Sequence, residues 1–338
     1  MKILVTGGLG YIGSHTVVEL QNKGFEVVII DNLSNSSEDV LTGITTITGK
    51  VPGFEKIDLK NRTAVQEFFK KNNDINGVIH FAASKAVGES VTNPLLYYEN
   101  NISSLVHVLQ ELQQKPKANF IFSSSCTVYG QADEMPIDEN ASIKPAMSPY
   151  GNTKQIGEEI INDVVKVSTI NAILLRYFNP IGAHPSAEIG ELPIGVPQNL
   201  VPFITQTGTG LRTELMVYGN DYPTVDGTCI RDYIHVVDLA KAHVVALERL
   251  LENKNEDKVE IFNLGTGVGT SVLEVIASFE KVSGKPFPYK IVDRREGDVT
   301  MAYASTDKAN TVLGWKTASS LDQAMESAWK WEQKIRKK

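Results

Sequence analysis

Two groups of residues in this chain could together move a hydride and a proton at one carbon atom. Residues 6–13 read Thr-Gly-Gly-Leu-Gly-Tyr-Ile-Gly and place Gly7, Gly10 and Gly13 in the spacing of a turn that binds a dinucleotide pyrophosphate. Tyr150 and Lys154 lie four residues apart, so on a helix they share one face. A phenol and an ammonium beside a nicotinamide ring can take and return the proton of an alcohol. Together these features predict an enzyme that transfers hydride at a carbinol carbon.

Three side chains are candidates for the proton transfer. The phenol of Tyr150 has an ordinary pKa of about 10, but the ammonium of Lys154 and a positive nicotinamide ring both favour the phenolate. Lys154 can also hydrogen-bond the nicotinamide ribose. Ser125 ends a buried strand, from which its hydroxyl could hold the substrate oxygen. Because a tyrosine and a lysine at this spacing also occur by chance, this prediction depends on the glycine turn.

The glycine turn lies between a buried strand and a helix, as a dinucleotide site requires. Gly7 gives the turn backbone freedom, Gly10 lets the chain approach a pyrophosphate, and Gly13 allows close helix packing. The pyrophosphate would lie at the helix N-terminus. Asp31 ends the next strand, where a carboxylate can accept both ribose hydroxyls and would repel a 2′-phosphate, so we expect NAD rather than NADP. Asp58 could hold the adenine amine, or it could instead cap the helix that follows.

Short apolar segments alternate with amphipathic ones up to residue 178, a pattern typical of a parallel sheet with helices on both faces. Ligands of such sheets bind beyond the carboxyl ends of the strands. The expected strands are residues 2–6, 26–31, 77–81, 119–125 and 171–177, and the expected helices between them are residues 11–23, 61–70, 94–113 and 149–167.

The rest of the chain is rich in glycine and proline at first and predicts a second lobe. We therefore expect an α/β fold, with a Rossmann-type doubly wound parallel sheet and a smaller, discontinuous C-terminal lobe that binds substrate. The sheet domain would span residues 1–178 with a return at 232–264, and the lobe 179–231 and 265–338. Loops such as residues 131–149 usually frame a site or are disordered. The expected later elements are helices at 199–208, 232–251, 271–283 and 321–336 and strands at 259–264 and 289–292.

Bulk composition excludes several classes of protein. The 338 residues carry a formal net charge of −7, which argues against a nucleic-acid partner. The six histidines do not cluster at ligand spacing, so we expect no metal site. No apolar stretch approaches the roughly 20 residues of a membrane span. Two isolated cysteines fit a reducing cytosol, so a cytoplasmic location is expected.

Longer segments resemble the extended short-chain dehydrogenases/reductases almost end to end, and within them the UDP-hexose 4-epimerases. Those around Lys85, Asn179 and Arg231 are specific to this subfamily. The segments that carry the resemblance are Val5-Thr6-Gly7-Gly8-Leu9-Gly10-Tyr11-Ile12-Gly13-Ser14-His15, Asp31-Asn32-Leu33, Val78-Ile79-His80-Phe81-Ala82-Ala83-Ser84-Lys85-Ala86-Val87-Gly88-Glu89-Ser90, Phe120-Ile121-Phe122-Ser123-Ser124-Ser125, Leu175-Arg176-Tyr177-Phe178-Asn179-Pro180, Arg231-Asp232-Tyr233-Ile234-His235-Val236 and Arg294-Arg295-Glu296-Gly297-Asp298.

The resemblance implies a reaction and a set of site residues. Tyr150 would take the proton of the sugar 4-hydroxyl while C4 passes hydride to tightly held NAD. The 4-keto intermediate would turn about its link to the β-phosphate and take the hydride back on its other face, which interconverts UDP-glucose and UDP-galactose. Lys154 would tune Tyr150, and Ser125 would assist at O4. The implied cofactor pocket comprises Gly7, Gly10, Tyr11, Ile12, Gly13, Asp31, Asn32, Asp58, Phe81, Ala82, Lys85, Asn100, Tyr150, Lys154 and Tyr177, and the implied UDP-sugar pocket comprises Ser125, Tyr150, Asn179, Asn199, Leu200, Tyr218, Arg231, Arg295, Asp298 and Ala302.

One position departs from part of the family. Members restricted to unsubstituted hexoses tend to carry a tyrosine four residues after the aspartate of Arg-Glu-Gly-Asp, where this chain has Ala302. A small residue there opens space near the sugar C2 substituent. We therefore expect turnover of UDP-GlcNAc and UDP-GalNAc as well, unless the neighbouring Tyr303 fills the space.

Related activities and an assembly state stay open at this point. A nucleotide-sugar 4,6-dehydratase usually carries Asp-Glu after the serine, whereas here Cys126 and Thr127 follow Ser125. A UDP-glucuronate 4-epimerase or decarboxylase is compatible with the same pattern, while a non-catalytic NAD sensor would lack the tyrosine and lysine. The family implies a homodimer through helices 94–113 and 149–167. The alternative is that their apolar residues pack only on their own sheet, namely Leu105, Val108, Leu109 and Leu112.

Overall fold

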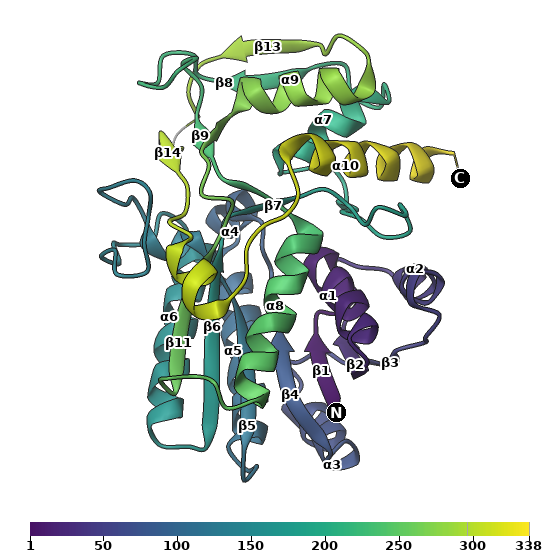
Figure 1. The fold of residues 1–338 in the computed structure, drawn as a ribbon, viewed down its shortest axis with the longest axis vertical. Helices are drawn as coiled ribbons and strands as arrows, with labels where there is room; N and C mark the ends of the chain where they lie inside the picture. Colours follow the sequence, from purple (N-terminus) through teal and green to yellow (C-terminus); the bar gives the residue numbers. More distant parts are fainter. Residues whose placement is uncertain (296, 338) are drawn as a thin grey trace.

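A parallel sheet forms the base of the molecule. The computed structural model describes residues 1–295 and 297–337. Within these ranges the sheet contains β1 (Lys2–Thr6), β2 (Glu26–Asp31), β3 (Gly53–Lys56), β4 (Ile75–His80), β5 (Ala118–Ser125), β6 (Ile170–Tyr177) and β11 (Val259–Leu264). Their order is β11-β6-β5-β4-β1-β2-β3 (Figure 1). The order reverses between β1 and β4, and sheets of this kind bind ligands at that reversal.

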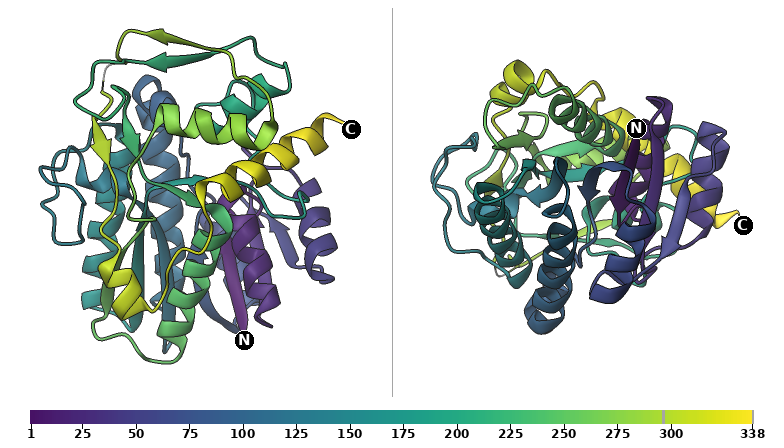
Figure 2. Two further views of the ribbon diagram at one scale, coloured as in Figure 1. Left: turned by 45° about the horizontal axis from the view of Figure 1, so that its top comes forward. Right: turned by 90° about the horizontal axis from the view of Figure 1, so that it is seen from below.

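Helices cover both faces of the sheet, as the views in Figure 2 show. Both faces of the strands are therefore buried, which explains why their sequences are almost continuously apolar. One face packs against α1 (Tyr11–Asn22), α2 (Asp39–Thr48), α8 (Val236–Leu251) and the π-helical turn η2 (Ala309–Leu313), and the other against α3 (Arg62–Lys71), α5 (Pro94–Leu112) and α6 (Pro149–Lys166). The short α4 (Val87–Thr92) and the 3₁₀ turn η1 (Cys126–Tyr129) contact α6.

A smaller lobe lies over the carboxyl ends of the strands (Figure 1). It has a core of its own, in which Ile204, Phe279, Met325 and Trp329 are buried. Its elements are β7 (Asn179–Ile181), α7 (Leu200–Gly208), β8 (Leu215–Tyr218), β9 (Ile230–Arg231), β10 (Tyr233–His235), β12 (Thr270–Ser271), α9 (Val272–Ser283), β13 (Tyr289–Val292), β14 (Met301–Ala302) and α10 (Leu321–Arg336).

Local sequence explains where the two site helices begin. The hydroxyl of Ser148 accepts a hydrogen bond from the backbone N–H of Gly151 at 3.1 Å, and Pro149 occupies the first turn, so α6 begins just before Tyr150. Helix α1 follows Gly10, which has no side chain to cap it. The first N–H groups of α1 are therefore available to an anion.

The fold class predicted from the sequence is confirmed, but some elements differ. The helix expected at 232–251 begins at Val236, because Tyr233–His235 instead form β10 and pair with β7. The helix α3 is capped by Asn61, whose side chain accepts from the N–H of Ala64 at 3.2 Å, so the capping role considered for Asp58 is wrong. Elements that were not predicted include α2, α4 and the edge strand β3. Across the described ranges, no helix is long and apolar enough to span a membrane. The domain boundaries stay a prediction.

Candidate active site

The three candidates for proton transfer meet at the carboxyl end of β5. Ser125 is the last residue of that strand, and Tyr150 and Lys154 occupy the start of α6; each is less than a tenth exposed. The hydroxyl of Ser125 lies close enough to the phenol of Tyr150 to lower its pKa. The ammonium of Lys154 lies 5.8 Å from the centre of the Tyr150 ring and donates to the backbone carbonyl of Ser123 at 2.7 Å. The structure therefore places these side chains together, as proton transfer requires.

Burial sets the charge states of this group. It raises the pKa of Tyr150 well above the ordinary value, an effect that Tyr177 reinforces and the nearby Ser125 hydroxyl opposes. Burial also lowers the pKa of Lys154 to about 8, while the carboxylate of Glu158 acts in the opposite direction. Tyr150 is thus a neutral phenol at rest. A positive nicotinamide ring beside it, in addition to the ammonium of Lys154, would favour the phenolate and make Tyr150 a usable base. The ammonium of Lys154 is lost as the pH rises through about 8.

The glycine turn follows β1, beside the reversal of strand order. Gly7 has φ +67°, and a Cβ on it would lie 2.8 Å from the backbone nitrogen of Ala82. A Cβ on Gly13 would collide with the carbonyl oxygen of Gly7. Asp31 is buried at the end of β2, where its carboxylate accepts the N–H groups of Leu9 and Leu33 at 3.1 and 2.9 Å. The turn, the uncapped start of α1 and this carboxylate fit the dinucleotide that the sequence predicts.

The other predicted cofactor residues surround this turn. Phe81 follows β4, and its N–H donates to the carbonyl of Thr6 at 3.0 Å. Ile12 packs against the core beside the sheet. The backbone N–H of residue 57 donates to the carbonyl of Asp31, which brings the exposed Asp58 and the half-buried Asn32 to the same edge of the sheet.

Two more of these residues join the lobe to the sheet domain. The hydroxyl of Tyr11 donates to the carbonyl of Gly182 at 2.7 Å. The ammonium of Lys85 lies 5.7 Å from the centre of the Tyr11 ring and 3.2 Å from the carboxylate of Glu191. Glu191 also accepts the amide of Asn199 at 2.7 Å. A predicted cofactor residue and a predicted substrate residue thus share one carboxylate.

Asn100 and Tyr177 are the remaining predicted cofactor residues. The side chain of Asn100 donates to the hydroxyl of Ser84 at 3.2 Å. The hydroxyl of Tyr177, at the end of β6, hydrogen-bonds that of Ser123 at 2.6 Å. Tyr177 is paired in register with Ser125 on the neighbouring strand, so it lies at the same end of the sheet as Tyr150.

The predicted UDP-binding residues lie on several elements of the lobe. Arg295 makes a two-point contact with Asp298, with N–O distances of 3.2 and 2.8 Å, and its guanidinium lies 5.4 Å from the centre of the Tyr218 ring. Arg231 on β9 is paired in register with Ala302 on β14. Asn179 begins β7, and Asn199 and Leu200 lie at the start of α7. Glu296, between Arg295 and Asp298, lies outside the described residues.

Sequence reasoning missed residues that position these elements. Asp232 is fully buried, and its carboxylate accepts the N–H groups of Thr266, Gly267 and Ala304 at 2.8, 3.1 and 3.1 Å. It thereby holds the segments that carry Arg231 and Ala302. The residue type of Asp232 did not indicate this role, because nothing in the neighbouring sequence distinguishes it from an acidic residue on the surface.

Asn101, adjacent to the predicted Asn100, was also missed. Its side chain accepts the N–H of Ser84 at 2.8 Å and donates to the hydroxyl of Thr153 at 3.0 Å. Thr153 in turn donates to the carbonyl of Tyr150 at 2.7 Å. Asn101 thus ties the loop after β4 to the first turn of α6.

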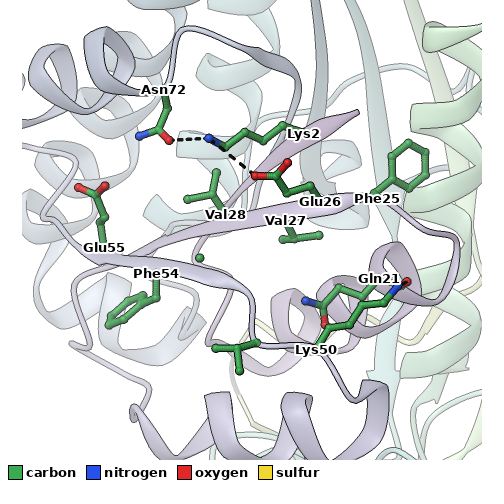
Figure 3. A pocket seen from close by; sticks show the side chains of 12 residues that line it. Lys2, Gln21, Phe25, Glu26, Val27, Val28, Lys50, Phe54, Glu55 and Asn72 are labelled. Carbon is green, nitrogen blue, oxygen red and sulfur yellow. Dashed lines mark hydrogen bonds and ion pairs between the residues drawn. The ribbon is translucent and has the colours of Figure 1, made fainter.

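A hollow elsewhere on the molecule does not belong to this site. It lies at the amino ends of the strands and contains Lys2, Glu26 and Gly53, each the first residue of its strand (Figure 3). The glycine turn, Ser125 and Tyr150 lie at the opposite, carboxyl ends. We therefore leave this hollow out of the candidate site.

Comparison with known proteins adds names to this geometry. The family model described as GDP-mannose 4,6 dehydratase matches residues 4–328. A UDP-glucose 4-epimerase of Bacillus subtilis is 49% identical over 333 residues, which cover 98% of this chain and 97% of that protein. The solved UDP-glucose 4-epimerase of Stenotrophomonas maltophila, with bound NAD and formylated UDP-arabinopyranose, is 46% identical, with a TM-score of 0.96 over 100% of this chain and 99% of its own. That of Bifidobacterium longum, in complex with NAD+ and UDP, is 44% identical, with a TM-score of 0.94 over 99% of both chains.

Proposed function

The chain belongs to the UDP-glucose 4-epimerase family, and from this premise we propose that it interconverts UDP-glucose and UDP-galactose with bound NAD. The observation that carries the proposal is the contact of Tyr150 with Ser125 and Lys154 at the carboxyl end of β5, beside the glycine turn. A phenol that exchanges a proton with a substrate hydroxyl must come within hydrogen-bond reach of it, and Ser125 beside Tyr150 can hold a hydroxyl there.

The chain's own residues then have separable roles in the reaction. Ser125 holds the sugar O4 next to Tyr150, which removes the proton from O4 and later returns it. NAD, when bound, supplies the acceptor and the donor of hydride at C4. The ammonium of Lys154 stabilises the phenolate form of Tyr150. Because inversion requires the hydride to return to the opposite face of C4, the hexose has to turn between the two steps.

The lobe would hold the UDP moiety while the hexose turns. Arg231 and Arg295 carry planar guanidinium groups, which bind diphosphate oxygens at two points. In the structure Arg295 is occupied by Asp298, so substrate would have to share or replace that contact. Tyr218 lies beside Arg295 and offers a ring face to the uracil.

A dehydratase is the less suitable assignment, although the matching family model bears that name. Elimination of water needs an acid–base pair after the serine, and this chain has Cys126 and Thr127 there. Burial raises the pKa of the Cys126 thiol to about 12, so this thiol is a poor proton donor at neutral pH. Threonine supplies no acid either. A UDP-glucuronate substrate has no support from the named relatives.

Proton NMR of the anomeric region tests the proposal directly. Purified protein without added NAD is incubated with UDP-galactose, and the spectrum should show UDP-glucose appear until equilibrium. A parallel sample receives NAD, which separates loss of cofactor during purification from lack of activity. No conversion in either sample would contradict the proposed reaction.

Substrate breadth is a finer proposal, and we propose that the C2 position tolerates an N-acetyl group. Ala302 packs with Cys126 against the apolar cluster around Phe178. The charge of Arg231 opposes the rise that burial causes in the pKa of the Cys126 thiol, so Arg231 also lies near this position. The Tyr303 ring instead lies against Gly269, where a Cβ would come within 3.1 Å of it. This placement supports an open C2 pocket rather than one filled by Tyr303.

Replacing Ala302 by tyrosine should therefore reduce kcat/KM for UDP-GalNAc by about tenfold or more relative to UDP-galactose, because the added ring occupies the space of the acetamido group. Both substrates are measured on the same preparation by NMR. Tyr303→Ala is the matched control and should leave the ratio of kcat/KM for UDP-GalNAc to kcat/KM for UDP-galactose unchanged. Equal loss on both sugars for Ala302→Tyr, or a higher ratio for Tyr303→Ala, would refute the pocket assignment.

Assembly as a homodimer and a cytoplasmic location are further proposals from the family. Leu105, Val108 and Leu109 pack on their own sheet and are buried within one subunit, so they are not interface residues. Leu95, at the start of α5, is 78% exposed and lies nearer the outer surface. Light scattering of the purified protein would show whether two chains associate.

A further inference from the structure

A buried ion pair lies one helical turn beyond Lys154. The carboxylate of Glu158, on α6, accepts two hydrogen bonds from Arg176 on β6, with N–O distances of 3.0 and 2.6 Å. The same carboxylate accepts the hydroxyl of Ser124 on β5 at 2.5 Å. The side chains of Glu158 and Arg176 are 8% and 5% exposed. One carboxylate thus joins α6 to both β5 and β6, and its contact on β5 is with Ser124, the residue that precedes Ser125.

Stability alone does not explain this pair. Removing two charges from water has a cost that their attraction often only offsets, and apolar residues of similar volume are frequently as stable. Arg176 is not even fully satisfied, because within the described residues its Nη1 is buried without a hydrogen-bond partner. Its guanidinium lies over the Tyr129 ring, 4.8 Å from the centre. The position of the pair, one helical turn from Lys154, therefore points to a role in the proton transfer at Tyr150.

The groups that face Lys154 come from four elements. Helix α6 contributes Tyr150 and Glu158, and β5 contributes the carbonyl of Ser123 and the ring of Phe122, 5.0 Å from the ammonium. His80 on β4 is the third contribution, and β6 adds Tyr177, which hydrogen-bonds Ser123, and Arg176, which pairs with Glu158.

The charge states of these neighbours single out Glu158. Burial lowers the pKa of His80 to about 3, so His80 is neutral. Burial raises the pKa of Tyr177 to about 12, so Tyr177 is neutral too. Glu158 is the carboxylate that opposes the effect of burial on Lys154.

We propose that Glu158 is a positioning residue for the reaction, which keeps the ammonium of Lys154 charged beside Tyr150, while Arg176 balances the charge of Glu158. With Tyr150 neutral, Lys154, Glu158 and Arg176 carry one net positive charge, and a phenolate at Tyr150 makes the buried group neutral. The arrangement therefore favours ionisation of Tyr150 when the substrate gives up its proton. This inference rests on the proposed epimerase reaction and assigns no contact between Glu158 and substrate.

The pH profile of kcat for Glu158→Gln tests the proposal. Glutamine has the same shape and can still accept from Ser124, but it carries no charge. Because the ammonium of Lys154 is lost as pH rises, activity should fall on the basic side, and in E158Q that limb should move to lower pH by about one unit or more. KM should change little, since Glu158 does not touch substrate. Glu158→Asp keeps the charge and should retain the wild-type limb.

The matched control is a second buried ion pair far from Lys154. Arg249 on α8 donates to Glu260, near the start of β11, at 2.7 and 2.8 Å. Glu260→Gln should lower the melting temperature without moving the basic limb. Should E158Q not fold, the double variant Glu158→Gln/Arg176→Met removes both buried charges and should show the same direction of shift.

The outcomes separate this inference from the proposed function. A wild-type enzyme with epimerase activity and an unshifted limb in E158Q, or an equal shift in E260Q, would overturn the positioning role alone. A wild-type protein that converts no UDP-galactose with added NAD would contradict the reaction itself. A shift confined to E158Q, with E158D like wild type, supports the proposal.

Discussion

Replacing Tyr150 by phenylalanine is expected to lower kcat about a thousandfold, because it removes the group that takes and returns the O4 proton. The phenol is buried beside Ser125, the last residue of β5. KM should change little, since the UDP contacts lie in the lobe. The rate is measured by NMR with NAD in excess.

The control for this variant is Tyr98→Phe. Tyr98 on α5 accepts the side chain of Asn152 at 2.7 Å, so the variant loses one hydrogen bond to α6 outside the proton-transfer group. Its kcat should stay within about twofold of wild type, because one part-buried neutral hydrogen bond contributes only about 1 kcal/mol to stability. A loss below about tenfold in Tyr150→Phe would mean that another group is the base.

The features that the sequence predicted well are local ones. The glycine turn lies within eight residues, and Tyr150 and Lys154 lie within one helical turn, so spacing alone determines their geometry. Five of the six strands in the first 178 residues were predicted because burial on both faces leaves continuous apolar runs, and the edge strand β3 was missed. The family assignment rested on many such local segments that agreed at once, and the similar proteins confirmed it.

The features that were missed depend on contacts between distant segments. Asp232 acts on residues 266, 267 and 304, which only the lobe topology brings to it. Glu158 is four residues from Lys154, so its shared face was visible, but its partner Arg176 is on a strand 18 residues further along. Tyr233–His235 form a strand because β7 is there to pair with it, which an apolar run before a helix does not reveal.

The largest stability effect is expected from Arg176→Met. The substitution leaves the carboxylate of Glu158 buried without its ion-pair partner and with the hydroxyl of Ser124 as its remaining hydrogen bond, and breaking a buried pair in this way costs about 3–5 kcal/mol. The free energy of unfolding is measured by urea denaturation at pH 7 with NAD in excess, so that cofactor loss does not contribute.

Comparison with two further variants shows whether the cost comes from the unpaired charge. Lys166→Met breaks the exposed pair with Asp163 near the end of the same helix, and it should cost less than about 1 kcal/mol. Adding Glu158→Leu to Arg176→Met removes the stranded carboxylate and should recover most of the lost stability, even though it removes a second polar group. If the double variant were less stable than Arg176→Met, then packing and the hydrogen bond to Ser124, rather than charge, would account for the loss. If the double variant recovers stability but not activity, then the ion pair is needed for the reaction rather than for folding, as the position of Glu158 beside Lys154 implies.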